Sequence, residues 1–166
     1  MSPAPAGRLD RFLPLGSTSL FTYGTLLFPE VLRALLGRVP QSQPVSATGW
    51  RVAALENRSY PGLVAARGEI AHGRLLIGLS GDEWHLLDDF EDRRYELRRI
   101  ALSGGRDGLT YVWVDDAEAC PNAWDAQSFV LTYLPAYVER CAARHTRRVS
   151  AAPTAPHSPA VLPRST

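Results

Sequence analysis

Short apolar and β-branched runs recur along the chain and predict most of its strands. Gly, Pro, Asn and Ser bound these runs, and these are the residues that favour turns. The expected strands are 19–23, 49–56, 63–66, 69–79, 95–102 and 109–115. The sequence GGRDG at 104–108 is typical of a tight turn, so it should join the last two strands as a hairpin.

Apolar residues at helical spacing predict a first helix that starts at Pro29. Proline suits the first turn of a helix, and a leucine-rich stripe follows it as far as Gly37, a residue type that often ends helices. The next stretch, 37–48, carries two prolines among polar residues and is expected to be a loop.

Two further helices follow from capping residues and periodicity. Ser80 with Glu83 three residues later is a capping-box signature, and the helix that it opens should run to Phe90 or Glu91. The last helix is expected to have Asn122 as its N-cap. Pro135 should kink or divide that helix.

The order of elements, β-α-β-β-β-α-β-β-α, decides between fold classes. Most strands follow one another without the helical crossover that parallel strands need. We therefore expect an α+β fold with a mixed or mostly antiparallel sheet, rather than a doubly wound α/β fold.

Composition sets the expected limits of the domain. Both ends are rich in Pro and Ala, so residues 1–16 and 146–166 are expected to be flexible tails around a single domain at 17–145. No apolar run reaches the ~18 residues of a membrane span, and no signal-peptide pattern is seen. These features predict a cytoplasmic protein without a membrane partner.

Charge and the scattered Cys and His residues limit the possible partners. The formal net charge of +1 counts against a polyanion, so no nucleic-acid partner is expected. The arginine-rich segment 139–148 is interpreted as a solvated helix end, with a nucleic-acid contact as the alternative. Cys120 and Cys141 are isolated and the histidines are dispersed, which predicts neither a disulfide framework nor a metal site.

The segment Tyr23–Leu26, YGTL, lies between the first strand and the first helix. Gly24 would let a ligand approach the backbone without meeting a Cβ atom, and successive N–H groups there could bind an anion. Thr25 adds a hydroxyl group. A tight structural turn explains the same residues, and one glycine without a following lysine does not make a phosphate loop.

Glu91 differs from the other acids of the cluster 88–92. On a helix it would lie within ~40° of the apolar residues Trp84 and Leu87, so its carboxyl group would be partly buried. Burial raises a carboxyl pKa and makes the group a better base near neutral pH. The alternative is a solvated acidic helix end paired with one of the arginines at 93–94, which is our interpretation of the three aspartates.

The sequence YPGLV at 60–64 contains a second turn. Pro and Gly fix its conformation, and Tyr60 could reach from it into a cleft. A purely structural turn is the alternative that the pattern favours.

These motifs together resemble the gamma-glutamylcyclotransferase-like family, in its avirulence-induced-gene-like branch. The resemblance rests, in chain order, on FTYGTL at 21–26, YPGLV at 60–64, LDDFEDRRYELR at 87–98 and YVWV at 111–114. An aromatic and apolar pattern that starts at Trp124 also fits. The resemblance spans about residues 19–138, most of the expected domain.

The resemblance implies a small mixed, mostly antiparallel, β-barrel-like sheet flanked by helices. It implies a cleft between the YGTL turn and the end of the second helix. The implied reaction releases 5-oxoproline from a gamma-glutamyl amine or dipeptide, without a metal or organic cofactor. The expected partner is thus a small gamma-glutamyl substrate, and we expect a monomer or weak dimer.

The resemblance also implies which residues of this sequence form the site. Glu91 matches the catalytic glutamate, which would act as general base and then as general acid. The expected substrate-binding residues are Tyr23, Gly24, Thr25, Leu26, Tyr60 and Tyr95. Arg98 is expected to support the site.

Asp92 is a departure from the resemblance, because the family usually has Gly after the Phe-Glu pair. The extra negative charge beside Glu91 leaves the substrate preference open. A non-catalytic module that binds a small molecule in the same cleft is the main alternative to an enzyme. An adaptor that binds nucleic acid or a partner protein through the segment 139–148 is a third possibility.

Overall fold

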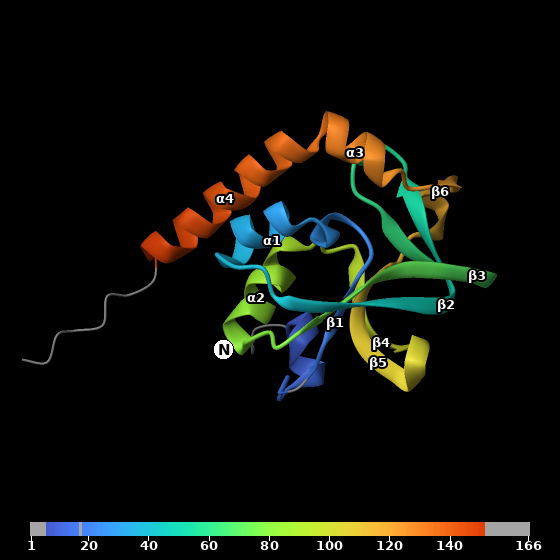
Figure 1. Ribbon diagram of the computed structural model, residues 1–166, viewed down its shortest axis with the longest axis horizontal. Helices are drawn as coiled ribbons and strands as arrows, with labels where there is room; N and C mark the ends of the chain where they lie inside the picture. The colour runs from blue at the N-terminus through green and yellow to red at the C-terminus, as the bar shows by residue number, and fades with distance from the viewer. Residues whose placement is uncertain (1–5, 17, 152–166) are drawn as a thin grey trace, which may run out of the picture.

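A long antiparallel hairpin forms the centre of the fold. It is seen in a computed structural model, which describes residues 6–16 and 18–151. The strands β2 (Gln41–Leu55) and β3 (Gly62–Ile77) pair from Gln41 opposite Ile77 to Ala53 opposite Gly62. Figure 1 shows these two strands crossing the molecule side by side.

Four shorter strands complete a six-stranded sheet around this hairpin. They are β1 (Leu20–Thr22), β4 (Tyr95–Leu102), β5 (Arg106–Trp113) and β6 (Ala119–Ala123), and the strand order is β4-β5-β1-β3-β2-β6. β5 is parallel to β1 and β3, whereas the other pairs are antiparallel. The sheet is curled into a half-barrel, which confirms the expected α+β class with a mixed, mostly antiparallel sheet.

Helices cover one side of this sheet. They are α1 (Pro29–Leu36), α2 (Gly81–Phe90), α3 (Ala126–Thr132) and α4 (Leu134–Ala151). In Figure 1, α4 passes over α1 and continues beyond it. The break between α3 and α4 falls just before Pro135, as predicted from the loss of its N–H group.

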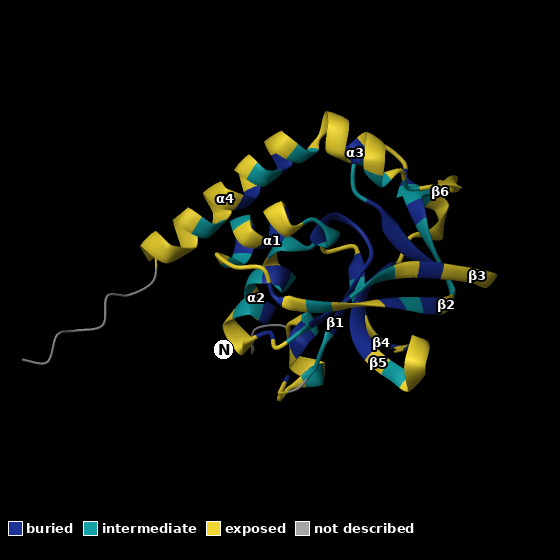
Figure 2. Cartoon of the chain, in the orientation of Figure 1, coloured by how far each residue is buried: buried dark blue, intermediate teal, exposed yellow. Residues whose placement is uncertain are grey.

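The sheet buries apolar side chains on both faces. Leu20 packs with the helices, whereas its neighbour Phe21 belongs to a second cluster with Leu63 and Val112, as the alternation of a strand requires. Trp84 of α2 is fully buried in the first cluster. Figure 2 shows the same division, with buried residues along the sheet and mostly exposed ones along the outer side of α4.

The predicted loop at 37–48 is wrong beyond its first four residues, because β2 begins at Gln41. Pro44 within it lacks an N–H group, but only β3 flanks this part of β2, since β6 pairs with β2 at 53–55. Proline is tolerated on such an edge. The buried Val45 and Ala47 are the apolar positions of this polar stretch.

The predicted strands 63–66 and 69–79 are one strand, β3. Two glycines take a left-handed conformation within the paired strands: Gly68 has a φ of +83° and Gly49, in the partner strand, a φ of +86°. The pairing shifts register between Thr48 and Trp50, so a bulge keeps both strands continuous.

The predicted start of the last helix is also wrong. Asn122 lies in β6, a strand that the sequence did not predict, and Asp125 is the N-cap of α3. The Asp125 carboxylate accepts hydrogen bonds from the N–H groups of Gln127 and Ser128, at 3.0 and 3.1 Å.

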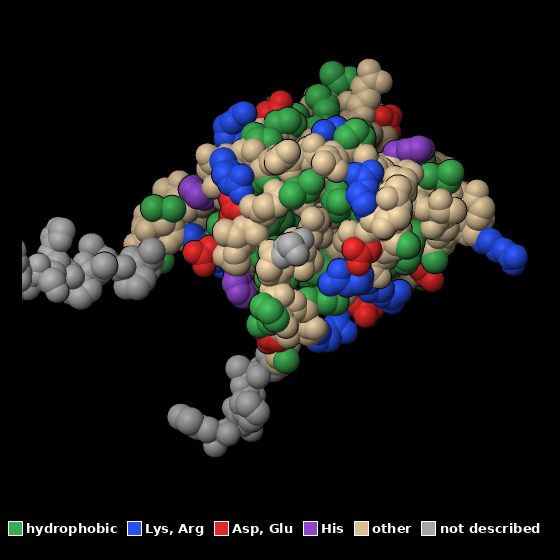
Figure 3. Space-filling model, turned by 60° about the horizontal axis from the view of Figure 1, so that its bottom comes forward, with side chains coloured by type: hydrophobic (Ala, Val, Ile, Leu, Met, Phe, Trp, Pro, Cys, Tyr) green, Lys and Arg blue, Asp and Glu red, His purple; other side chains and the backbone are tan. Residues whose placement is uncertain are grey.

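The expected flexible tails contain ordered structure. Residues Arg8–Phe12 form a short 3₁₀ helix, η1, whose Leu9 is only 2% exposed. At the other end, α4 continues to Ala151, and residues 152–166 of the expected tail lie outside the described residues. The face in Figure 3 carries basic and acidic side chains interspersed, in keeping with a formal net charge of +1.

Candidate active site

A cavity of about 320 Å³ opens where several distant segments meet. Its walls come from β1 and the following turn, the loop 59–61, the end of α2, β5 and α4. The structure brings all seven predicted site residues to this cavity: Tyr23, Gly24, Thr25, Leu26, Tyr60, Glu91 and Tyr95. Arg98 does not line it, because Arg98 pairs at the surface with Glu96 at 2.8 Å.

Position 24 of the YGTL turn must be glycine, because there is no space for a side chain. A Cβ atom at Gly24 would lie 2.7 Å from the Pro61 side chain, too close for any other residue without a shift. The turn continues into a short 3₁₀ helix, η2 (Thr25–Leu27). The N–H groups of Thr25 and Leu26 are the first of that helix, which has no carbonyl of its own to offer them.

The side chains of the turn have structural partners. The Thr25 hydroxyl lies 3.1 Å from the Tyr137 hydroxyl of α4, and Tyr23 donates to the backbone carbonyl of Tyr111. Leu26 is 5% exposed and belongs to the core. The turn therefore offers mainly its backbone to a ligand, while its side chains shape the wall.

Glu91 follows the last residue of α2 and faces the cavity. Its backbone is extended (φ −73°, ψ 138°), and its N–H group still donates to the Leu87 carbonyl. The residue is partly exposed because it lines an open cavity, but protein atoms enclose its carboxyl group. Burial, with the nearby charges of Asp88 and Asp92, raises the pKa of Glu91 to about 8, against a smaller lowering by Arg8.

Asp92, the next residue, has the opposite shift. Burial tends to raise its pKa, but hydrogen bonds from the Arg94 N–H and the Tyr60 hydroxyl, at 2.9 and 2.8 Å, lower it below the usual value. The pKa values of these two adjacent carboxyl groups therefore differ. Asp92 stays charged, whereas Glu91 can exchange a proton near neutral pH.

Tyrosine hydroxyls line much of the remaining wall. Tyr95 donates to the Pro61 carbonyl, and Tyr111 donates to the Asp88 carboxylate at 2.9 Å. Burial raises the pKa values of Tyr23, Tyr95 and Tyr111 well above the usual value, so these groups stay neutral. Neutral hydroxyls bind and orient polar groups without competing with Glu91 for its proton.

The partners of the acidic cluster differ from the sequence interpretation. Asp88 pairs with Arg8 at 3.1 Å and Asp89 pairs with Arg148, whereas the aspartates were expected to pair with Arg93 or Arg94. Asp92 does contact Arg94, but through the backbone N–H. The sequence did not predict that Asp92 would line the cavity.

Sequence reasoning missed four further residues at or beside the cavity: Arg8, Tyr111, Tyr137 and Arg140. The sequence singled out Tyr111 only as part of the YVWV motif, and Arg140 only as part of the arginine-rich segment 139–148. Arg8 had no signal, because it lies in a segment whose composition resembles a tail.

Metal and membrane features were sought in the same residues. Within 6–16 and 18–151, no three His, Cys, Asp or Glu side chains cluster as metal ligands. No helix of that part of the chain is both long and apolar enough to cross a membrane.

Comparisons with known proteins show which family this chain resembles. The model of the family "Gamma-glutamyl cyclotransferase, AIG2-like" matches residues 20–129. AIG2-like protein D of Arabidopsis thaliana is 30% identical over 129 residues, which cover 73% of this chain and 84% of that protein. AIG2-like protein C of the same organism is 33% identical over 116 residues, covering 66% and 67%.

Solved structures share the fold. A solution structure of an Arabidopsis thaliana protein matches with a TM-score of 0.58 and 22% identity, covering 85% of this chain and 97% of that one. A structure described as gamma-glutamyl cyclotransferase matches with a TM-score of 0.54 and 14% identity, covering 75% and 86%. At these identities the likeness concerns the fold alone.

Proposed function

This chain belongs to the AIG2-like gamma-glutamyl cyclotransferase family, and we propose that it releases 5-oxoproline from a gamma-glutamyl amine or dipeptide. The observation that carries the proposal is the position of Glu91. Glu91 and the YGTL turn line the same cavity, and the raised pKa of about 8 for Glu91 suits a group that accepts and returns a proton.

The proposed reaction starts with the α-ammonium group of the substrate. The Glu91 carboxylate accepts one proton from it, and the free amine then attacks the carbonyl carbon of the gamma-amide. A five-membered ring closes and an oxyanion forms. The oxyanion collapses and the bond to the leaving nitrogen breaks as Glu91 returns its proton to that nitrogen. The ring nitrogen gives up its second proton, which Glu91 passes to the departing amine. The leaving group is thus released as an ammonium ion, and the ring nitrogen of 5-oxoproline keeps one hydrogen.

The remaining groups of the cavity would hold the substrate in a folded conformation. The N–H groups of Thr25 and Leu26 would bind the substrate carboxylate or the oxyanion. The charged Asp92 would attract the α-ammonium group toward Glu91. Holding the amine against its own carbonyl gives a high effective molarity, which accounts for much of the expected rate.

Arg140 provides a basis for choice among leaving groups. It is the one basic side chain among the described residues that line the cavity, and it lies over the Tyr137 ring at 5.4 Å. A leaving amine that carries a carboxylate would be attracted to it. A gamma-glutamyl dipeptide is therefore the first substrate to try, ahead of a gamma-glutamyl amine with a cationic tail.

The test is 5-oxoproline release from a panel of gamma-glutamyl dipeptides and amines, with the native chain beside Glu91→Gln. We expect release by the native chain and a decrease of about 10³-fold in the variant, since general acid–base groups contribute ~10²–10⁴-fold. Asp89→Asn is the matched control, because it removes a carboxylate from the exposed side of the same helix.

Two results would change the proposal. An active Glu91→Gln variant would contradict the mechanism. No release from any substrate by the folded native chain would favour the alternative, a binding module that keeps the cavity but not the reaction.

A further inference from the structure

Helix α2 ends directly before the proposed base, and no left-handed residue follows it to pair its last carbonyl groups. The last carbonyl groups of a helix have no partner inside it, and a left-handed glycine after the helix often satisfies them. Here Glu91 is the C-cap in extended conformation, and Asp92 follows it. Among the described non-glycine residues, only Asn57 has a positive φ, so Asp92 does not take the place of that glycine.

Arg8, from the other end of the chain, donates to one of these carbonyls and to three carbonyls that follow the helix. Its Nη2 donates to the carbonyls of Asp88 and Glu91, at 2.6 and 3.1 Å. Its Nη1 donates to those of Asp92 and Tyr95, at 2.7 and 3.1 Å. The Nε lies 3.1 Å from the Asp88 carboxylate. The five N–H donors of a guanidinium group are all accounted for by the segment 88–95.

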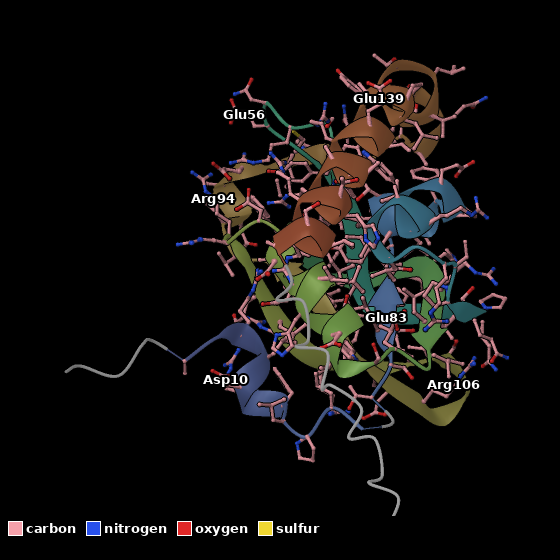
Figure 4. The ribbon with its side chains drawn as sticks, turned by 90° about the vertical axis from the view of Figure 1, so that its left-hand side faces the viewer. Asp10, Glu56, Glu83, Arg94, Arg106 and Glu139 are labelled. Atoms are coloured by element: carbon pink, nitrogen blue, oxygen red, sulfur yellow. The ribbon has the colours of Figure 1, made fainter. Side chains whose placement is uncertain are left out.

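The segment that carries Arg8 is docked on the domain. Leu9 is buried in the helix-side core, and the Arg8 guanidinium lies 5.2 Å from the centre of the Tyr111 ring. Figure 4 shows η1, marked by Asp10, beside α2 and β4, on the side of α2 away from α4. The contacts of Arg8 are therefore built into the fold.

We propose that Arg8 is a positioning residue, which fixes the backbone of Glu91 from the short helix η1. This inference rests on the proposed function. The guanidinium fork is needed because a lysine has one nitrogen and cannot reach four carbonyls at once.

The charge of Arg8 has a second consequence for Glu91. The charged groups around this carboxyl are Arg8 from η1, Asp88 from α2 and Asp92 from the following loop. The tyrosines that face it are Tyr23 from the YGTL turn, Tyr95 from β4, Tyr111 from β5 and Tyr137 from α4. They remain neutral because burial raises their pKa values. Arg8 is the cation that opposes the upward shift in the pKa of Glu91.

The test compares Arg8→Gln, Arg8→Lys and the native chain in steady-state kinetics from pH 5.5 to 9.5. Arg8→Gln should lower kcat by about 10–100-fold with little change in KM, because the base is displaced rather than the substrate site. Its acid limb should move upward by about one pH unit. Arg8→Lys should restore the acid limb but not kcat, since it returns the charge without the fork.

Arg11→Gln is the matched control, because Arg11 lies on the same 3₁₀ helix and makes one long contact, 3.4 Å, to the Leu97 carbonyl. It should match the native chain in kcat and in the acid limb. An Arg8→Gln variant with native kcat and a native acid limb would overturn the proposal. An Arg8→Lys variant with native kcat would overturn the role of the fork.

A second measurement separates this inference from the proposed function. Side-chain carboxyl ¹³C titration by NMR gives the pKa of Glu91 directly, without turnover. If the native chain releases no 5-oxoproline, the proposed function fails. A rise of about one unit in the pKa of Glu91 in Arg8→Gln, absent in Arg11→Gln, would still support Arg8 as the residue that holds this carboxyl group. Equal pKa values would count against it.

Discussion

The two ends of helix α2 are capped in different ways. At the N-terminus, Ser80 and Glu83 form a reciprocal capping box: the Ser80 hydroxyl accepts from the Glu83 N–H at 3.1 Å, and the Glu83 carboxylate accepts from the Ser80 N–H at 2.9 Å. At the C-terminus, the main cap is Arg8, about 80 residues away in the chain. A second arginine, Arg144 of α4, donates to the Phe90 carbonyl at 3.4 Å.

The local cap at the N-terminus of α2 contributes to stability alone, whereas the remote cap at its C-terminus also bears on the proposed function. A local cap uses neighbouring side chains and can be identified in the sequence. A remote cap leaves the side chain at the helix end free to line a cavity, because the backbone is held from outside. The proposed base stands at the second kind of end. Changes at the N-terminal end should therefore affect stability, and changes at the C-terminal end should also affect chemistry.

The largest effect is expected in the pH dependence of the C-terminal end. With a pKa of about 8, Glu91 is mostly protonated at pH 6 and half ionised at pH 8. The kcat/KM for 5-oxoproline release should rise roughly 50-fold over this range, as the fraction of the base form rises. The measurement is initial rates in buffers of constant ionic strength, and a flat profile would contradict the assignment.

The next effect is a pH-dependent difference in stability between the native chain and Glu91→Gln. The pKa of Glu91 rises from its usual 4.5 to about 8 on folding, so the folded state binds this proton more tightly than the unfolded chain. The resulting stabilisation is complete below pH 4.5 and is lost as the pH rises through 8. Over that range the native chain should lose on the order of 3 kcal/mol relative to the variant.

Urea unfolding of both proteins at pH 5, 7 and 9 measures this difference. The gap between their free energies of unfolding should change steadily across the three values. Asp89→Asn serves as the control, because this exposed carboxylate should produce no such trend. A constant gap would show that the Glu91 carboxyl is not buried in solution.

A smaller effect is expected from Ser80→Ala at the N-terminal end. Loss of the N-cap hydroxyl should reduce the free energy of unfolding by about 1 kcal/mol, since the Glu83 N–H loses its acceptor. The kcat and its pH dependence should stay at native values, because this end lies outside the cavity. Thermal unfolding and steady-state kinetics test the two parts, and a fall in kcat beyond the fraction unfolded would remove the distinction between the ends.

The smallest effect is expected from Arg144→Gln. Its contact with the Phe90 carbonyl is long and exposed, and it lies over the Phe90 ring at 5.8 Å. The variant should lose no more than ~0.5 kcal/mol of stability, in line with other exposed charged contacts. Parallel urea unfolding with Arg8→Gln measures the difference, and an equal or larger loss in Arg144→Gln would reverse the ranking of the two arginines.

The sequence by itself determined the features that depend on near neighbours. The capping box, the break before Pro135, the β4–β5 hairpin and the YGTL turn each involve residues a few positions apart. Helical spacing placed Glu91 beside the apolar stripe of α2, although the helix ends at Phe90 and Glu91 itself is extended. The motifs indicated the family. These local patterns were enough to predict the fold class, and the resemblance named seven of the residues that line the cavity.

Only the tertiary structure decided the features that depend on distant partners. The polar half of β2 becomes a strand because β3 lies beside it, and β6 forms because β2 offers it an edge. Arg8 acquires its role because the carbonyls of Asp88, Glu91, Asp92 and Tyr95 come within reach of one guanidinium group only in the folded chain. Buried backbone groups must be paired, but the chain chooses the partner in space, and neither periodicity nor composition records that choice.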